Sequence, residues 1–206
     1  MADKAKKVKF NLKNTHYALL TIGEDGAPTF GTPVPMPGSV SISLDANGEP
    51  ENFYADGGVY YVINNNCGYD GDLELALIPE SFRTDVLKET LDSKGVPIEN
   101  SEVELVAFAL LFEFDGDQKH IRHVLYNCSA SRPGIEGKTN EDSKEVQTEK
   151  LSLKAVPLAN GMVKAKTGNT TDATTYADWY KAVYVPAAEN DTATQSAAKP
   201  AKAVKE

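Results

Sequence analysis

Apolar and polar residues alternate along much of the chain, with the period of two that is typical of half-buried β-strands. The alternation is clearest in four segments, where serine, lysine or acidic residues occupy many of the intervening positions. The apolar positions of these segments are Val8, Phe10 and Leu12; Val40, Ile42 and Leu44; Leu73, Leu75 and Leu77; and Leu151, Leu153 and Ala155. Each segment is therefore expected to place one face on a core and the other in solvent.

A β-hairpin is predicted in residues 106–126, VAFALLFEFDGDQKHIRHVLY, with the pair Asp115-Gly116 at its turn. Every second residue from Phe108 to Phe114 is large and apolar, which gives one buried face. Ala109 and Leu111 make the opposite face apolar as well. We therefore expect this hairpin to lie in the centre of its sheet.

Two segments carry the period of an α-helix. In PESFRTDVLKETLDSKG we expect a helix from Ser81 to Lys94, ended by Gly95. Its apolar positions are Phe82, Val86, Leu87 and Leu91. A shorter C-terminal helix is expected in residues 172–184, with a stripe that consists of Tyr176, Trp179, Tyr180 and Val183. An aromatic stripe of this kind can bind a ligand, but a helix docked on a sheet is the favoured interpretation.

The periodic pattern ends at Pro186. Residues 187–206, AAENDTATQSAAKPAKAVKE, contain no aromatic residue, and we expect a low-complexity C-terminal tail there. The chain has 206 residues, of which 41% are hydrophobic, so one domain can bury a substantial core. The expected organisation is a mainly β domain over residues 1–186, followed by the tail.

The net charge of −9 is unevenly distributed. Residues 1–13 hold five lysines and one aspartate, and the charges of residues 187–206 cancel, so the body, residues 14–186, carries −13. Tight binding of nucleic acid needs clustered Lys and Arg. So acidic a body argues against a protein that grips DNA, but not against one that lets DNA pass.

No apolar run approaches the roughly 20 residues that span a bilayer, and no apolar stretch follows the first lysines, so neither membrane insertion nor secretion is expected. Cys67 and Cys128 are the only cysteines. Two isolated cysteines favour buried thiols in a reducing compartment over a disulfide. We therefore expect the chain to fold in the cytosol.

The stretch SRPGIEGKT is the strongest candidate for an enzyme motif, because Gly137-Lys138-Thr139 matches the end of a phosphate-binding loop. Arg132 stands where that loop needs its first glycine, and the acid-rich NEDSKEVQ follows where a helix should begin. The stretch is interpreted as a solvated loop between strands.

Other candidate chemistry is equally weak. His120 and His123 are three residues apart on an expected strand, so their side chains should point to opposite faces and cannot share a metal. DANGEPENFYAD begins like a calcium loop at Asp45, but Pro50 stands where the turn needs glycine and Asp56 where the last ligand should be glutamate. No nucleophile motif occurs, so no catalytic, cofactor-binding or metal-binding residue is assigned and no enzyme is expected.

Several phrases, taken in order, resemble the major tail proteins of long, non-contractile-tailed bacteriophages (siphophages), which form the tail tube. They are KVKFNLKNTHYA, FGTPVPMPGSVSISLD, FYADGGVYYV, GYDGDLELALIPESFRTDVL, FALLFEFDGDQKHIRHVLYNCSASRPG and QTEKLSLKAVPL. Together they cover most of the expected domain, and their order and spacing make the resemblance specific. The tail after Pro186 matches nothing in it.

The resemblance implies a β-sandwich or barrel with a flanking helix, which would be Ser81–Lys94. It further implies hexameric rings, stacked into a tube through which DNA is ejected without specific binding. The partners would be further copies of this chain and other tail proteins (tape measure, terminator and distal tail), the location the virion after assembly in the host cytoplasm, and no cofactor or membrane would be involved. An acidic lumen, typical of the family, agrees with the charge of the body.

The segment from Asn47 to Asp56 has the composition of an exposed loop and ends near two aromatic residues. In related tubes a long loop or hairpin between early strands reaches a neighbouring subunit. The candidate inter-subunit contacts are accordingly Asn47, Glu49, Phe53, Tyr54 and Asp56. The alternative is an ordinary turn, after which Phe53 and Tyr54 begin the next strand.

Two other functions compete with the tail tube. A β-sandwich decoration protein or adhesin on a virion would share the strands but would not assemble into rings. A carbohydrate-active enzyme would need two carboxylates at a set separation in a cleft, and nothing in the sequence singles out such a pair.

Overall fold

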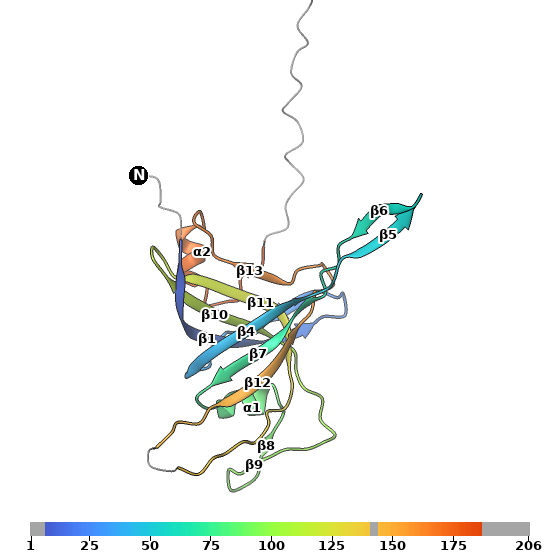
Figure 1. Cartoon of the computed structure of the whole chain (residues 1–206). Helices are drawn as coiled ribbons and strands as arrows, with labels where there is room; N and C mark the ends of the chain where they lie inside the picture. Colours follow the sequence, from blue (N-terminus) through green and yellow to red (C-terminus); the bar gives the residue numbers. More distant parts are fainter. Residues whose placement is uncertain (1–6, 141–143, 187–206) are drawn as a thin grey trace, which may run out of the picture.

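The computed structural model describes residues 7–140 and 144–186, in which thirteen β-strands and two short α-helices follow one another (Figure 1). The strands are β1 Lys9–Ile22, β2 Pro28–Phe30, β3 Val34–Pro35, β4 Ser39–Asn47, β5 Glu51–Ala55, β6 Gly58–Ile63, β7 Gly68–Leu75, β8 Thr90–Leu91, β9 Pro97–Ile98, β10 Phe108–Gly116, β11 Ile121–Ala130, β12 Glu149–Ala155 and β13 Lys164–Lys166. The helices are α1 Glu80–Asp85 and α2 Ala173–Asp178. The predicted mainly β fold, with a flanking helix and a short C-terminal helix, is confirmed; the predicted tail lies outside the described residues.

One antiparallel sheet forms the body, in the order β2-β1-β10-β11-β12-β7-β4, with β3 paired to β1 and β13 to β11. One edge of strand β11 pairs with β10. The other edge has two partners, because residues 123–125 pair with β13 and only residues 128–130 pair with β12. The sheet can therefore fold over, so that β4, β7 and β12 cross in front of β1, β10 and β11 (Figure 1). Ser39 on β4 donates a hydrogen bond of 2.6 Å to Thr15 on β1, which brings the two layers together at one edge.

The main core lies between these layers, and α1 contributes to it. Phe82 of α1 is fully buried and packs edge-on against Tyr17 and Phe108, with ring centroids 5.2 and 5.3 Å apart. The Tyr17 hydroxyl donates to Asp85 at the end of the helix, over 2.7 Å. Burial of a side chain of this size contributes about 2 kcal/mol, so Phe82 anchors the helix.

A second core covers the opposite face of β10 and β11. Ala109 and Leu111 are buried there under Trp179 and Val183, which follow α2, because that helix ends at Asp178 and is shorter than the predicted one over 172–184. The aromatic stripe therefore packs on the sheet, as the favoured interpretation had it. The central position predicted for the hairpin is confirmed by the strand order, but β10 runs through Asp115 and Gly116, so the turn falls at residues 117–120.

The helix expected from Ser81 to Lys94 was predicted too long. It ends at Asp85, because Lys88 adopts a left-handed backbone with a φ of 60°. The chain then turns back through β8 and β9, and Asp92 accepts hydrogen bonds from the backbone of Lys94 and Val96 in the turn between them. Leu91 is half-exposed instead of facing the core.

The strand alternation is confirmed for β12, whose residues Leu151, Leu153 and Ala155 are all buried. It fails at the ends of other strands, because four expected core residues are about half-exposed or more. These are Val8, Phe10, Val40 and Leu77. In β1 the cause is a register shift between Phe10 and Leu12, where Asn11 has a φ of 53°, and such a bulge turns side chains to the other face.

Only one of the two cysteines is buried, against the expectation for both. Cys67 is exposed, whereas burial of Cys128 raises the pKa of its thiol to about 12. Cys128 therefore stays protonated and shielded at neutral pH.

In dilute native protein a thiol reagent should modify Cys67 alone, and Cys128 only after denaturation. Modification of both cysteines in the folded protein would contradict this assignment.

Candidate subunit interface

Strands β5 and β6 form a two-stranded hairpin that projects from the body beyond the ends of β4 and β7 (Figure 1). Its base is fixed by two hydrogen bonds: Cys67 N donates to Asn47 O over 2.9 Å, and the side-chain amide of Asn65 donates to Glu49 O over 3.3 Å. Gly48 has a φ of +116°, and a Cβ there would lie 2.5 Å from Asn65 O. The chain therefore crosses closely at this point, which directs the hairpin away from the body.

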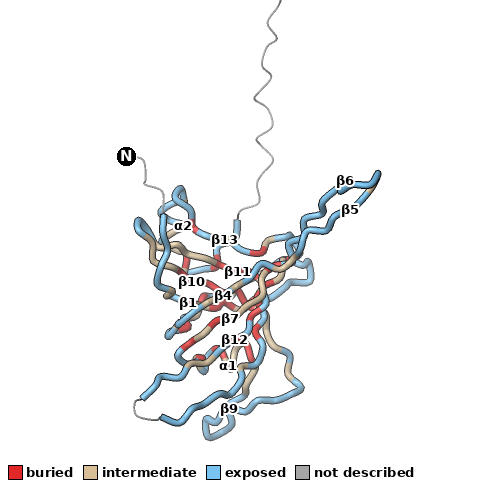
Figure 2. The backbone as a smooth tube through the Cα atoms, viewed as in Figure 1, coloured by how far each residue is buried: buried red, intermediate tan, exposed pale blue. Residues whose placement is uncertain are grey.

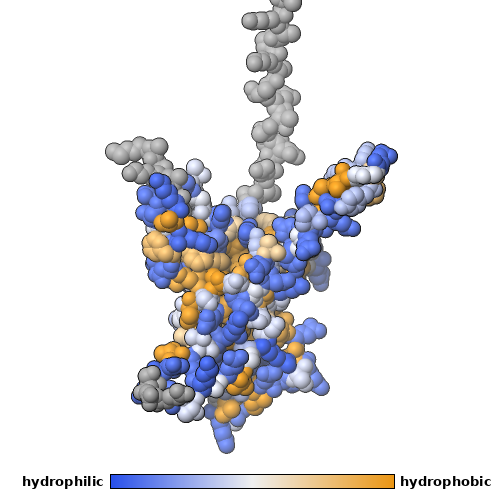
Figure 3. Space-filling model, viewed as in Figure 1, coloured by the Kyte–Doolittle hydropathy of each residue, from blue (hydrophilic) through white to orange (hydrophobic). Residues whose placement is uncertain are grey.

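The hairpin carries large apolar side chains on both faces, and all of them are exposed (Figures 2 and 3). The register pairs Phe53 with Tyr61 on one face and Tyr54 with Val59 on the other. The seven large apolar residues of the hairpin are 42–71% exposed; they are Phe53, Tyr54, Val59, Tyr60, Tyr61, Val62 and Ile63. An isolated two-stranded hairpin is marginally stable in water, and contiguous exposed apolar surface marks an interaction site.

All the charged side chains of the hairpin are acidic. Between Asn47 and Cys67 the chain contains Glu49, Glu51 and Asp56 and no lysine or arginine. None of the three carboxylates forms an ion pair within the described residues. The interface that this hairpin offers is therefore aromatic in its centre and negative around it.

The five residues predicted as contacts divide into two groups. Phe53, Tyr54 and Asp56 lie in the projecting part, with Asp56 in the turn at a φ of 51°. Asn47 is part of the base, where its amide donates to Asp70 over 2.8 Å, and Glu49 lies between base and strand. Phe53 and Tyr54 belong to strand β5, which already begins at Glu51, and this strand projects from the body (Figure 1). The structure places them so, but whether they contact another subunit stays a prediction.

Residues of β6 were missed as candidate contacts. Val59, Tyr60, Tyr61, Val62 and Ile63 follow Gly57-Gly58 directly. The sequence does contain a signal for them, since two apolar β-prone stretches on either side of an Asp-Gly-Gly turn are typical of a hairpin.

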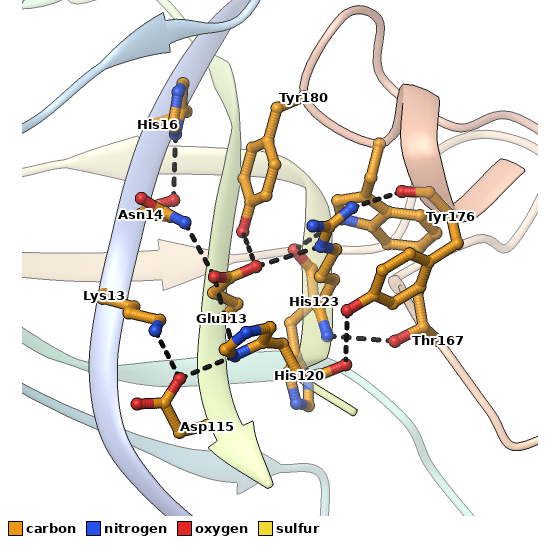
Figure 4. Close-up of polar contacts among 12 residues, drawn as sticks. Lys13, Asn14, His16, Glu113, Asp115, His120, His123, Thr167, Tyr176 and Tyr180 are labelled. Carbon is orange, nitrogen blue, oxygen red and sulfur yellow. Dashed lines mark hydrogen bonds and ion pairs between the residues drawn. The ribbon is translucent and has the colours of Figure 1, made fainter. Parts of the chain in front are cut away.

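A buried polar cluster lies where α2 meets the sheet (Figure 4). Its centre is Glu113, which is 1% exposed and accepts from Arg122 over 3.0 Å and from Asn14 over 2.7 Å. The Arg122 guanidinium lies 3.9 Å from the ring of Tyr176 and also donates to the backbone of that residue. The Tyr180 hydroxyl, 3.3 Å from Glu113, has a raised pKa because it is buried beside that carboxylate. Every charged group here has a partner, which is typical of a structural cluster that docks α2.

Among the described residues, no group of three or more His, Cys, Asp or Glu side chains could hold a metal ion. This applies to the pair His120 and His123 and to the acidic loop that begins at Asp45. His120 precedes β11 and lies 2.6 Å from Asp115, whereas His123 stacks on Phe112. The Lys13 ammonium and the Asn11 amide lower the pKa of Asp115 to about 2. In the part of the chain that is described, no helix is long and apolar enough to cross a bilayer.

The stretch SRPGIEGKT is an exposed loop that leaves β11, as expected, and the described residues between it and β12, 140 and 144–148, are not helical. Lys138 is tied through its backbone to the Gln147 side chain, which both accepts from Lys138 N and donates to Lys138 O.

Replacement of Lys138 by alanine should therefore leave folding and assembly unchanged, because its hydrogen bonds to described residues are all made by its backbone. Calorimetry should show no heat of ATP binding to the unmodified protein. Micromolar ATP affinity that is lost in Lys138→Ala would contradict this interpretation.

No family model matches the chain, and no curated protein matches its sequence. Several solved structures align with it, including the following two. One is the tube-terminating cap of the anti-feeding prophage, at 8% identity and a TM-score of 0.39 over 79% of this chain and 94% of that one. The other is a type six secretion system protein, at 13% identity and a TM-score of 0.35 over 75% and 91%. Similarity at this level does not establish a shared fold.

Proposed function

We propose that this chain is a structural subunit of a bacteriophage tail tube, which forms hexameric rings that stack around a channel for DNA. The observation that carries the proposal is the β5–β6 hairpin, an aromatic arm that is exposed on both faces and fixed at its base. Aromatic side chains are enriched in the centres of protein interfaces. A hairpin with two such faces has the form of an assembly element that neighbouring copies bury.

The ordered phrases that resemble siphophage major tail proteins supply the particular assembly. The mainly β body with flanking helices agrees with the fold that this resemblance implies. One aligned structure is named as a tube-terminating cap of a prophage. The present proposal assigns this chain to a particle of the same broad kind, on the grounds of its own residues and not of that alignment.

The charge of the body suits a passage for DNA. Residues 14–186 carry a net charge of −13, and rings of subunits multiply that charge around any channel. A negative wall repels phosphate and keeps DNA from binding as it moves. The role proposed here is therefore mechanical, with no catalysis.

Negative-stain electron microscopy of the purified protein over a concentration series tests the proposal. We expect rings at intermediate concentration and tubes of uniform width at high concentration. Monodisperse monomers at every concentration would contradict it and would favour a decoration protein or adhesin, whose exposed hairpin would bind a different partner.

A further inference from the structure

An apolar cavity lies between the two layers of the body. Its volume is about 200 Å³, smaller than the roughly 300–1,000 Å³ of most small-molecule sites. Residues from β1, β4, β7, β10, β11 and β13 line it, among them Lys9, Leu44, Tyr69, Phe114, His123 and Lys164. It therefore suits one or two side chains better than a metabolite.

The cavity is lined by aromatic rings that already contact one another. His123 stacks on Phe112 at 5.0 Å and meets Phe114 edge-on at 5.6 Å. Aromatic rings pack favourably with further rings in such offset and edge-on arrangements. An incoming tyrosine or phenylalanine would thus extend an existing aromatic cluster.

Two exposed lysines border the cavity. The Lys9 ammonium lies 4.5 Å from the centre of the Phe114 ring, and the Lys164 ammonium lies 4.2 Å from that of Tyr69, whose hydroxyl it also contacts. Neither lysine forms an ion pair with a carboxylate among the described residues. The rim of the cavity therefore carries two positive charges that no carboxylate among the described residues neutralises.

These properties are complementary to those of the hairpin. The hairpin has exposed aromatic side chains and three acids without ion pairs, whereas the cavity has an aromatic lining and two lysines without carboxylate partners. Six residues of extended β6 span about 20 Å, and the fixed base holds the tip away from the body. The hairpin of one molecule is therefore positioned to reach a second molecule and not its own cavity.

We propose that the tip of the hairpin, around Tyr54 and Tyr60, docks into the Lys9–Lys164 cavity of a neighbouring copy, with Asp56 in the turn near the two lysines. The contact is heterologous, because each copy offers its hairpin to one neighbour and its cavity to another. Contacts of this type close into rings or continue as filaments. This inference rests on the proposed function and names the surface that receives the hairpin.

Charge reversal in the full chain tests the docking. The double variant Lys9→Glu/Lys164→Glu and the single variant Asp56→Lys should each raise the concentration needed for assembly about tenfold or more. The triple variant Lys9→Glu/Lys164→Glu/Asp56→Lys should restore assembly toward that of the unmodified protein, since the charges are then exchanged and not repelled. Lys94→Glu/Lys138→Glu is the matched control, with the same charge change at exposed sites away from the cavity, and should assemble normally.

A photo-cross-linker placed at Tyr60 separates this inference from the proposed function. Cross-linked peptides between differently isotope-labelled copies should include residues around Lys9, Phe114 or Lys164. Tubes with cross-links to other segments, no rescue in the triple variant, or an anionic ligand retained in native mass spectrometry and lost in Lys9→Glu/Lys164→Glu would overturn the docking but leave the tube. Cross-links to the cavity in oligomers that are neither rings nor tubes would support the docking and contradict the tail-tube function.

Discussion

Replacement of Tyr54, Tyr60 and Tyr61 by threonine should give a folded monomer that assembles only at a much higher concentration. The three side chains are 64–71% exposed in the single chain, so their loss should change its free energy of unfolding little. In an interface, buried aromatic anchors contribute about 1 kcal/mol or more each. Because about 1.4 kcal/mol corresponds to a tenfold change in affinity, the concentration needed for assembly should rise roughly a hundredfold.

Sedimentation velocity over a concentration series measures this effect, and circular dichroism checks the fold. Threonine retains a high β-propensity, so the hairpin itself should persist. The matched control is Leu77→Thr/Ile135→Thr/Val146→Thr, which also removes exposed apolar side chains but from sites outside the hairpin. If both triple variants assemble as the unmodified chain does, the hairpin is not the interface.

Loss of Arg122 should have the largest effect on stability. Arg122→Ala leaves the carboxylate of Glu113 buried without its cationic partner, a change that costs about 3 kcal/mol or more. It also removes the cation that packs on Tyr176, so α2 should loosen from the sheet. Urea unfolding of dilute, monomeric protein, followed through the fluorescence of Trp179, measures both consequences.

Two controls separate the burial of the charge from a general loss of packing. Lys150→Ala removes an exposed lysine that pairs with Asp72 over 2.9 Å, and should change stability little. Glu113→Leu/Arg122→Met replaces the pair with apolar side chains and should recover much of the loss. An Arg122→Ala protein no less stable than the Lys150 variant would show that the cluster does not hold α2.

The parts of the fold that follow from local periodicity could be predicted from the sequence. Leu151, Leu153 and Ala155 alternate without interruption, and β12 is a regular strand with that face buried. The doubly apolar stretch around Ala109 and Leu111 likewise indicated a strand covered on both faces. In both cases the residue pattern and the packing are set by the same few neighbours in the chain.

The errors occur where long-range contacts or special backbone conformations override the pattern. Leu91 continues the helical spacing, but the left-handed Lys88 and the Asp92 turn redirect the chain into β8 and β9. Phe10 continues the strand alternation, but a bulge rotates it outward. The spacing of apolar residues gives no indication of the positive φ angles at Asn11 and Lys88.

The candidate interface was predictable in place but not in extent. Phe53 and Tyr54 were singled out by their aromatic character after a loop, whereas Tyr60 and Tyr61 were missed, although the Asp-Gly-Gly turn before them is a hairpin signal and β5 and β6 do pair. The lysine-bordered cavity could not be predicted, because Lys9 and Lys164 are brought to it by strands far apart in the chain.

The most direct test of the account is a cryo-EM reconstruction of the particles that the unmodified chain forms. We predict stacked six-fold rings with an acidic channel wall, in which both faces of the β5–β6 hairpin are buried between copies. A reconstruction in which the hairpin points into solvent, or in which no ring forms, would contradict the claim that this arm is the assembly element.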